Sequence, residues 1–305
     1  MAAVPKVSVI TCTHNPRRDY LDLVIDGLRA QTADLCNWEY LVIDNASDPD
    51  RRPSVDLSWH PHTRIVREEK LGLTAARLRG IVESQGTILV FVDDDNVLAP
   101  DYLDHVIQIA DHKPFIGAWS GQCLPQFEKA PPEWTRRYWG NLVIREFAND
   151  VWSNLPRLDL TMPCGAGLCV RRVVANRYVH LHESGQRKFQ FDRTGNSLLS
   201  GGDNDLAACA CDVGLGVGLF HSLKLTHLIP SERLSVDYLS RLAEGIQFSS
   251  ILLDAAREGA PPPASLSGWM ADQLRLIRLR GPHRTIRKAV YRGRSRARRH
   301  LQDAQ

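Results

Sequence analysis

The sequence predicts an α/β fold with a doubly wound, mainly parallel sheet. Three observations predict it. Strand-like and helix-like segments alternate over about the first 110 residues, most of the strand-like segments are β-branched runs, and three carboxylates follow the most apolar of these runs. The carboxylates are Asp93, Asp94 and Asp95. Because ligands of open α/β sheets bind outside the carboxyl ends of the strands, this block marks the expected functional edge.

Elements in the first part of the chain have clear signals. The strands are β-branched or apolar runs that end in turn-forming residues, and the helices place apolar residues on one face. Thr74 is the expected N-cap of one helix, and Pro100 lies in the first turn of another, where its missing N–H is tolerated. These signals predict strands at residues 6–12, 39–43, 64–67 and 87–92, and helices at 17–31, 74–84 and 100–111.

The later part has a weaker pattern. Prolines, tryptophans and charges between residues 122 and 160 indicate long loops over a surface. A proline run after residue 260 ends a long helical segment. The remaining signals predict strands at 115–120, 161–170 and 223–229, and helices at 201–211 and 236–258.

Composition indicates an ordinary globular protein. The 305 residues are 43% hydrophobic, which suffices for one large domain or two small ones. The first residues lack the basic and apolar regions of a signal peptide, and no apolar segment approaches the ~20 residues that span a bilayer. The seven cysteines are odd in number and lack zinc-site spacing, so reduced thiols are expected. We therefore expect a cytoplasmic protein.

A basic tail follows an acidic body. Residues 271–305 contain eleven Lys or Arg and two acids, a net +9, so the other residues carry −6 of the total +3. Leu274, Ile277 and the pair Trp269-Met270 fall on one helical stripe flanked by arginines. This pattern is typical of a helix lying on anionic lipid, so peripheral attachment at the inner face of the cell membrane is expected, with nucleic acid disfavoured as partner. A disordered, solvated tail is the simpler alternative.

Three adjacent carboxylates need compensation, because like charges repel. Divalent cations supply it, and Mg²⁺ typically takes one or two carboxylates together with substrate phosphates. A solvated acidic turn after the strand explains the same residues. The acids alone leave both alternatives open.

Six short segments, in chain order, carry a family pattern. They are Thr-Cys-Thr-His-Asn-Pro (11–16), Val-Ile-Asp-Asn-Ala-Ser-Asp (42–48), Gly-Leu-Thr-Ala-Ala-Arg (72–77), Phe-Val-Asp-Asp-Asp-Asn (91–96), Pro-Cys-Gly-Ala-Gly-Leu (163–168) and Gly-Asp-Asn-Asp-Leu (202–206). Together they resemble the family-two glycosyltransferases over residues 5–245. The resemblance implies the GT-A fold, a Rossmann-like doubly wound mixed sheet, here with C-terminal helices and a basic tail.

The resemblance implies an inverting enzyme that uses a nucleotide-sugar donor, most commonly a UDP-sugar. It places Asp95 and Asp93 on Mn²⁺ or Mg²⁺ at the donor diphosphate, with His227 as a further metal ligand. A core histidine explains His227 equally well. Asp44 would form a hydrogen bond with the edge of the nucleotide base. The alternative explanation is that Asp44 only forms an Asx-turn after the strand. The other nucleotide-sugar contacts that the resemblance implies are Thr11, Thr13, Asn15, Arg77 and Asp94.

The same resemblance aligns Asp203 with the family's catalytic aspartate, the general base that takes the proton of an acceptor hydroxyl. The sequence departs from the family here, because Gly202 replaces the usual Glu and Asp205 offers a second carboxylate. At a helix start Asp203 is equally a candidate N-cap, and Asp205 is a first-turn acid. The implied acceptor is a saccharide, glycolipid or glycoprotein.

These motifs suggest a division of the chain: a catalytic domain at 1–235, with a nucleotide-sugar half (1–112) and an acceptor half (113–235), a helical segment at 236–270 and the tail at 271–305. Two other functional classes remain. A nucleotidyltransferase shares the layout, but the loop after the first strand lacks the glycines such enzymes usually carry there. A non-catalytic nucleotide- or nucleic-acid-binding protein would have no need for the metal acids and Asp203 together.

Overall fold

The structure, a computed structural model, describes residues 4–156, 160–187, 198–259 and 265–303. The chain forms two compact units. Unit 1 comprises residues 1–126, 143–188 and 202–229, and unit 2 comprises residues 127–142, 189–201 and 230–305. The predicted division of the chain at residues 112, 235 and 270 stays a prediction.

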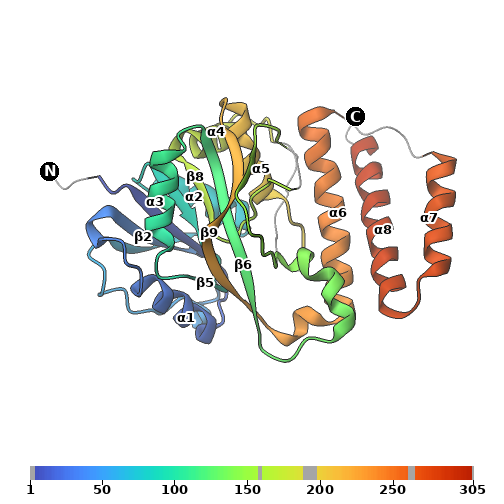
Figure 1. The fold of residues 1–305 in the computed structure, drawn as a ribbon, viewed down its shortest axis with the longest axis horizontal. Helices are drawn as coiled ribbons and strands as arrows, with labels where there is room; N and C mark the ends of the chain where they lie inside the picture. The colour runs from blue at the N-terminus through green and yellow to red at the C-terminus, as the bar shows by residue number, and fades with distance from the viewer. Residues whose placement is uncertain (1–3, 157–159, 188–197, 260–264, 304–305) are drawn as a thin grey trace. The chain divides into compact units, whose positions relative to one another are not determined.

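Unit 1 is built around a mixed sheet (Figure 1). Among the described residues nine strands form it in the order β3-β2-β1-β4-β8-β6-β9-β5, with β7 beside β9. β1, β2, β3 and β4 pair in parallel, whereas β8 is antiparallel to both β4 and β6. The predicted doubly wound mixed sheet is therefore confirmed, whereas the expectation of a mainly parallel sheet holds only for β1 to β4, because the described pairs of β5, β7 and β8 are antiparallel. The strands are β1 (Val7–Thr13), β2 (Trp38–Asn45), β3 (Thr63–Glu68), β4 (Ile88–Phe91), β5 (Asn96–Leu98), β6 (Ile116–Phe127), β7 (Val151–Ser153), β8 (Leu168–Arg171) and β9 (Gly216–Ile229).

Helices cover both faces of this sheet. In β1, Val7 and Val9 join one buried cluster and Ile10 joins the other, as the alternation of side chains along a strand requires. The first cluster includes α1 (Arg18–Arg29) and α3 (Tyr102–His112); the second includes α2 (Leu73–Glu83), α4 (Arg172–Glu183) and α5 (Gly202–Asp212). Burial on both faces explains why the central strands are continuous apolar runs. Short 3₁₀ helices lie at η1 (Leu35–Asn37), η2 (Pro49–Arg51), η3 (Glu133–Leu142) and η4 (Ser231–Leu234).

Three local expectations were wrong. The region 122–160 is not a run of loops, because β6 continues to Phe127 and η3 and β7 follow. The strand expected at 161–170 is confined to β8, since Gly167 adopts a φ of 67° and the Leu168 N–H donates to the Gly165 carbonyl in a turn. Helix α2 is capped at Gly72, two residues before the expected Thr74, and Gly72 has a φ of 138° that favours glycine.

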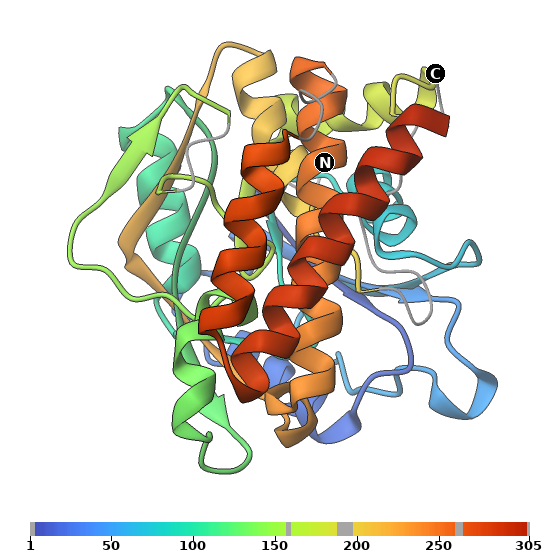
Figure 2. The same cartoon turned by 90° about the vertical axis from the view of Figure 1, so that its right-hand side faces the viewer.

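In its described residues, unit 2 contains the α-helices α6 (Val236–Glu258), α7 (Leu266–Arg278) and α8 (Gly281–Asp303). α6 has the predicted bounds. Figures 1 and 2 show α6 and α8 side by side, and α8 buries Ile286, Ala289, Gly293 and Ala297. The Arg292 guanidinium donates to the Glu244 carboxylate of α6 at 2.9 Å. The alternative of a disordered tail is therefore wrong for residues 265–303. In the described part of the chain, no helix is both long and apolar enough to cross a membrane.

Gly293 lets α8 approach α6 closely. A Cβ atom at this position would lie 2.3 Å from the Glu244 carbonyl oxygen, far inside van der Waals contact. We expect Gly293→Ala to lower the free energy of unfolding of unit 2 by about 1–2 kcal/mol, because the strain outweighs the better helix propensity of alanine. Urea denaturation measures this. Gly140→Ala is the matched control, since nothing lies within 4 Å of its Cβ position. Equal stability of the two variants would contradict the close packing.

Candidate active site

Several of the predicted site residues lie at one edge of the sheet in unit 1. β1, β2 and β4 are parallel neighbours, so their carboxyl ends meet there. The register places Thr13 opposite Asp44, and Asp93, Asp94 and Asp95 follow directly on β4. This is the edge at which open α/β sheets bind their ligands.

Asp44 is a buried carboxylate held by two donors. Its Oδ2 accepts from the Arg67 guanidinium at 2.6 Å, and its Oδ1 accepts from the Ser47 N–H at 3.2 Å. Burial alone would raise the pKa of Asp44, but the bonds from Ser47 and Arg67 lower it below its ordinary value. Asp44 is therefore a fixed, ionised acceptor at neutral pH.

Asn15 fastens the loop after β1 to the loop after β2. Its backbone has a φ of 52°, its N–H donates to Ser47 Oγ at 2.9 Å, and its amide exchanges two hydrogen bonds with Asp48 at 3.0 and 2.9 Å. The side chain thus has a structural task in this turn. The expected contact between Asn15 and a nucleotide stays a prediction.

Asn45 has a similar task on the other side of β2. Its Oδ1 accepts from the Gly72 N–H at 2.8 Å and its Nδ2 donates to the Lys70 carbonyl at 2.8 Å. These bonds fix the loop that leads into α2, which carries Arg77. Asn45 therefore positions a predicted site residue without being one itself.

The two threonines of β1 differ in position. Thr11 is fully buried and its Oγ1 accepts from the Tyr40 hydroxyl at 3.2 Å. Burial raises the pKa of Tyr40 above its ordinary value, so the phenol stays protonated and donates. Thr13 lies nearer the edge, and its hydroxyl donates to Asp94. The geometry therefore supports a site role for Thr13 and Asp94, whereas Thr11 belongs to the core beneath them.

Asp95 and His227 are brought together by the pairing of β5 with β9, which sets Asn96 opposite His227. His227 Nε2 lies 3.5 Å from Asp95 Oδ2, and Asn96 Nδ2 donates to Asp95 Oδ1 at 2.9 Å. Two neighbouring ligands of an octahedral Mg²⁺, each about 2.1 Å from the ion, are about 3 Å apart. The two donors therefore fit one divalent cation after a small adjustment.

Few side chains of the described residues are placed to act as ligands of such an ion. Among the described residues there is no group of three or more His, Cys, Asp or Glu side chains arranged to hold a metal. Asp93 is half-buried, and its carbonyl accepts the Asn96 N–H at 3.0 Å in the turn after β4. A cation here would complete its shell with water or substrate oxygens, as Mg²⁺ commonly does.

Asp203 lies beside Arg77 across a glycine. Asp203 Oδ2 accepts from the Gly165 N–H at 2.6 Å, and Oδ1 accepts from the Asn204 N–H at 2.9 Å. A Cβ atom on Gly165 would lie 3.1 Å from both Asp203 Oδ2 and Arg77 Nη2. The turn before β8, the start of α5 and the buried arginine of α2 therefore converge on one point, and a side chain at residue 165 would crowd the two groups.

Asp205 is used differently from Asp203. Its carboxylate is fully buried and accepts two bonds from Arg187, at 2.7 Å from Nε and 2.9 Å from Nη2. The Arg187 side chain is itself only 7% exposed. A carboxylate enclosed in this way and paired with a cation is poorly placed to take a proton from a substrate. Of the two candidate bases, the geometry favours Asp203.

Sequence reasoning missed Arg67, Asn45 and Arg187. Arg67 lies directly opposite Asp44 in the β2–β3 register, so a parallel pairing of these two predicted strands would have found it. Asn45 follows Asp44 in the turn, where its only signal is its residue type. Arg187 is 18 residues from its partner, and no local pattern connects the two.

Known proteins are similar to parts of this sequence. EpsH of Bacillus subtilis is 28% identical over 109 residues, which are 35% of this chain and 30% of EpsH. A dolichol-phosphate mannosyltransferase of Pyrococcus furiosus is 31% identical over 112 residues, 34% of this chain and 29% of that protein. The chain thus matches less than a third of the length of these relatives.

The fold of a solved mannosyltransferase from Pyrobaculum calidifontis, PcManGT in complex with GDP-Man and Mn²⁺, is also similar. Its TM-score is 0.59 at 17% identity, over 99% of this chain and 89% of that one. This likeness identifies the fold as GT-A. The family described as "Glycosyl transferase family 2" matches residues 8–174, more than half of the sequence. The chain therefore belongs to glycosyl transferase family 2.

Proposed function

We propose that this glycosyltransferase moves a sugar from a nucleotide-diphosphate sugar, with a UDP-sugar as donor, to a hydroxyl of a saccharide, glycolipid or glycoprotein acceptor, with inversion at the anomeric carbon. One observation carries the proposal. A single edge of unit 1 holds a fixed carboxylate at Asp44, the metal-compatible pair Asp95 and His227, and the half-buried carboxylate Asp203 beside the buried Arg77. The family membership sets aside the nucleotidyltransferase and non-catalytic alternatives.

Asp44 is the residue that we assign to binding the nucleotide base. A carboxylate with both oxygens oriented by Arg67 and Ser47 still has lone pairs for a further donor, because each oxygen accepts two bonds. The imide N–H of uracil is such a donor. Thr13 and Asp94 lie on the same edge, next to where the ribose would follow.

Asp95 and His227, with Asp93 beside them, would hold Mn²⁺ or Mg²⁺ on the donor diphosphate. A cation bound there stabilises the charge on the leaving nucleoside diphosphate as a Lewis acid. Arg77 contributes a buried positive charge from α2 to the same region. The Mn²⁺ in the complex of PcManGT supports a metal-assisted site. That complex holds a GDP-sugar, whereas we propose a UDP-sugar. The identity of the nucleotide base is therefore the first property of the donor to measure.

Asp203 would act as the general base. As the acceptor oxygen attacks the anomeric carbon, its proton passes to the Asp203 carboxylate, and the bond from the anomeric carbon to the diphosphate breaks on the opposite side. The Gly165 N–H orients the carboxylate through Oδ2. One in-line displacement needs no covalent enzyme intermediate and inverts the anomeric centre.

A lipid-linked acceptor is consistent with the comparisons. The name of the Pyrococcus furiosus relative specifies dolichol phosphate, a lipid carrier. An enzyme acting on such an acceptor works at a membrane surface, where peripheral attachment helps.

Nucleotide binding tests the donor site. We expect one of UDP, GDP and dTDP, at about 100 times its dissociation constant with Mn²⁺ present, to raise the melting temperature by about 5 °C. Asp95→Ala should abolish the metal-dependent part, because it removes one of the two paired donors. Asp22→Ala is the control, an exposed carboxylate on α1. A donor-sugar hydrolysis screen with the nucleotide that binds then identifies the sugar.

Two outcomes would contradict the proposal. A folded protein that responds to none of the three nucleotides with Mn²⁺ present lacks the donor site. An Asp95→Ala variant that keeps the full metal-dependent shift places the metal elsewhere.

A further inference from the structure

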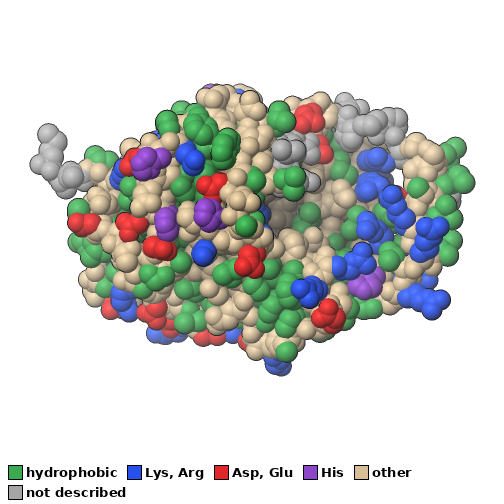
Figure 3. Space-filling view, in the orientation of Figure 1, with side chains coloured by type: hydrophobic (Ala, Val, Ile, Leu, Met, Phe, Trp, Pro, Cys, Tyr) green, Lys and Arg blue, Asp and Glu red, His purple; other side chains and the backbone are tan. Residues whose placement is uncertain are grey.

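The outer face of α7 in unit 2 carries a solvent-exposed apolar stripe. Leu266, Met270, Leu274 and Ile277 are 83%, 58%, 57% and 73% exposed. With 3.6 residues per turn, these positions fall within an arc of about 80° on one side of the helix. Scattered exposed apolar residues are ordinary, but four in line on one helix mark an interaction surface. Figure 3 shows hydrophobic side chains along this outer side of α7. The side chain of Trp269, predicted to join the stripe, lies outside the described part.

The opposite face of α7 is already held by α8. The Asp272 carboxylate accepts from Arg294 at 3.0 Å, and the Tyr291 hydroxyl donates to the Asp272 carbonyl at 3.4 Å. Leu276, on the same face, is buried. These contacts fix the rotation of α7, so the stripe points away from the helix that supports it. The stripe therefore has no task in the packing of α7 on α8.

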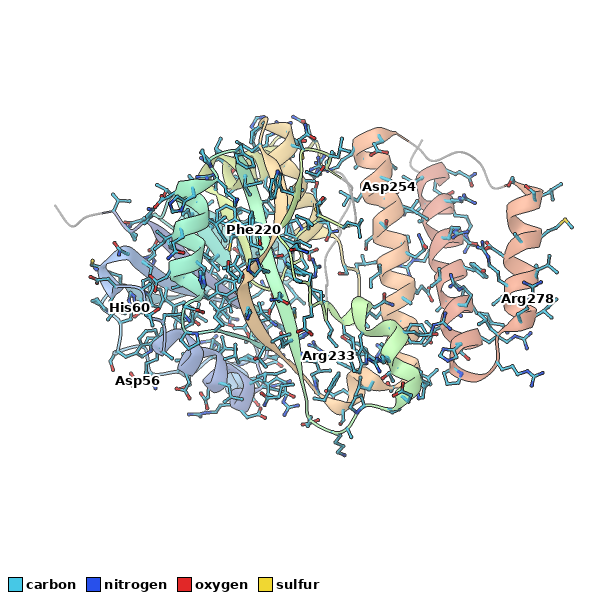
Figure 4. The ribbon with its side chains drawn as sticks, in the orientation of Figure 1. Asp56, His60, Phe220, Arg233, Asp254 and Arg278 are labelled. Carbon is cyan, nitrogen blue, oxygen red and sulfur yellow. The ribbon has the colours of Figure 1, made fainter. Side chains whose placement is uncertain are left out.

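Positive charge lies beside the C-terminal end of the stripe. Arg278 and Arg280 are exposed there, whereas Arg275, 66% exposed, lies 3.6 Å from Asp272 on the other face of α7. Figure 4 labels Arg278, which projects from that end of the helix. Figure 3 shows Lys and Arg side chains gathered over α8 and α7. Exposed basic residues of α8 extend the positive surface: Arg284, Lys288, Arg292, Arg296 and Arg299. Arg292 and Arg296 are partly neutralised by Glu244.

We propose that the outer face of α7 docks on the surface of an anionic lipid bilayer. The four apolar side chains enter the boundary between headgroups and acyl chains, and the arginines bind the anionic headgroups beside them. Charge complementarity selects this partner. A purely apolar protein surface would leave the arginines unpaired, and nucleic acid would leave the apolar stripe in water. α8 supports the docking helix from behind through its contacts with α6.

Because α7 carries the stripe and α8 holds α7 in place, the test variants should change α7 and keep α8. Deleting residues 271–305 would remove α8 and expose the face of α6 that it covers, so point substitutions on α7 are the appropriate change. Leu274→Gln with Ile277→Gln alters two exposed side chains and leaves Asp272 and Leu276 in place. Val82→Gln with Val173→Gln is the matched control, two apolar residues of unit 1 that are 66% and 51% exposed.

Co-sedimentation of the full chain with vesicles tests the proposal. We expect binding to phosphatidylcholine vesicles that contain about one third phosphatidylglycerol, and little binding to pure phosphatidylcholine. The Leu274→Gln/Ile277→Gln variant should lose about 100-fold in partition coefficient, tenfold for each side chain, while the control binds like wild type. Arg278→Gln with Arg280→Gln should lose about 30-fold, and high salt should weaken wild-type binding.

Several results would overturn the proposal. The wild type could fail to bind anionic vesicles, or it could bind neutral and anionic vesicles equally. The folded Leu274→Gln/Ile277→Gln variant could also bind anionic vesicles as strongly as wild type. A concentration-dependent dimer that this variant abolishes would assign the stripe to self-association, and equally strong binding to duplex DNA would assign the charge to nucleic acid. The nucleotide shift depends on residues of unit 1. A normal nucleotide response without vesicle binding therefore refutes the membrane surface and leaves the proposed donor site intact.

Discussion

Replacing Asp203 by Asn is expected to lower kcat by about 10²- to 10⁴-fold while the thermal response to nucleotide and metal is kept. The side-chain oxygen of Asn can still accept the Gly165 N–H that Asp203 accepts at 2.6 Å, so the turn before β8 and the start of α5 keep their connection. The amide cannot take up a proton. The amide nitrogen also cannot accept the Asn204 N–H that Asp203 Oδ1 accepts at 2.9 Å, so the substitution removes the proposed base and one backbone hydrogen bond at the start of α5.

The measurement is single-turnover or steady-state sugar transfer, with kcat and KM determined separately. A general base acts in the transition state, so kcat should fall and the KM for the donor should change little. Asp212→Asn is the control, a carboxylate at the other end of α5 that lies 3.9 Å from Arg177. An unchanged kcat in Asp203→Asn would show that Asp203 only caps the helix and that another group takes the proton.

The fold of unit 1 followed from local signals because its central strands are covered on both faces. In β1 and β2 both sets of alternating side chains contain buried apolar residues, and polar residues follow at the edge where the site lies. The predicted strand boundaries were wrong where tertiary contacts determine where a strand begins. The segment 161–167 was expected to continue the strand of β8, yet Pro163, Gly165 and Gly167 disfavour a strand, and the Tyr102 hydroxyl donates to the Gly167 carbonyl at 2.8 Å and holds a turn there.

The C-terminal region shows a different limit. Its high positive charge suggested a tail that could be disordered, since few large apolar residues are present to form a core. The buried face of α8 consists mainly of Ala289, Gly293 and Ala297, which carry little hydrophobic signal. These small residues allow α8 to approach α6 closely. Because this contact depends on both helices, the sequence of either segment alone does not predict it.

The site was predicted where residues share a strand end and missed where distant segments meet. Thr13 and Asp44 lie at the carboxyl ends of β1 and β2 and Asp95 follows β4, so the topology of a parallel sheet brings them to one edge. The choice between Asp203 and Asp205 could not be made from spacing, because both lie in the first turn of the same helix. Arg187, which approaches Asp205 from a separate segment, separates their roles.

Removing one partner of the Asp205–Arg187 pair should have the largest effect on stability. Asp205 is fully buried and Arg187 nearly so, and their guanidinium and carboxylate make two parallel hydrogen bonds. Asp205→Ala leaves a buried guanidinium without its counter-ion. We expect a loss of about 3–5 kcal/mol in the free energy of unfolding, measured by urea denaturation. Arg187→Ala should cost a similar amount, since it leaves the carboxylate buried and uncompensated.

The paired replacement separates structure from catalysis. Arg187→Met with Asp205→Leu substitutes apolar groups for both charges, and it should recover most of the stability that either single variant loses, because no unpaired charge remains. The same double variant should keep measurable sugar transfer, since Asp203 retains its bond to Gly165. A stable double variant whose kcat falls as far as that of Asp203→Asn would contradict this assignment. In that case Asp205 itself would take the proton, and Arg187 would be the residue that positions it.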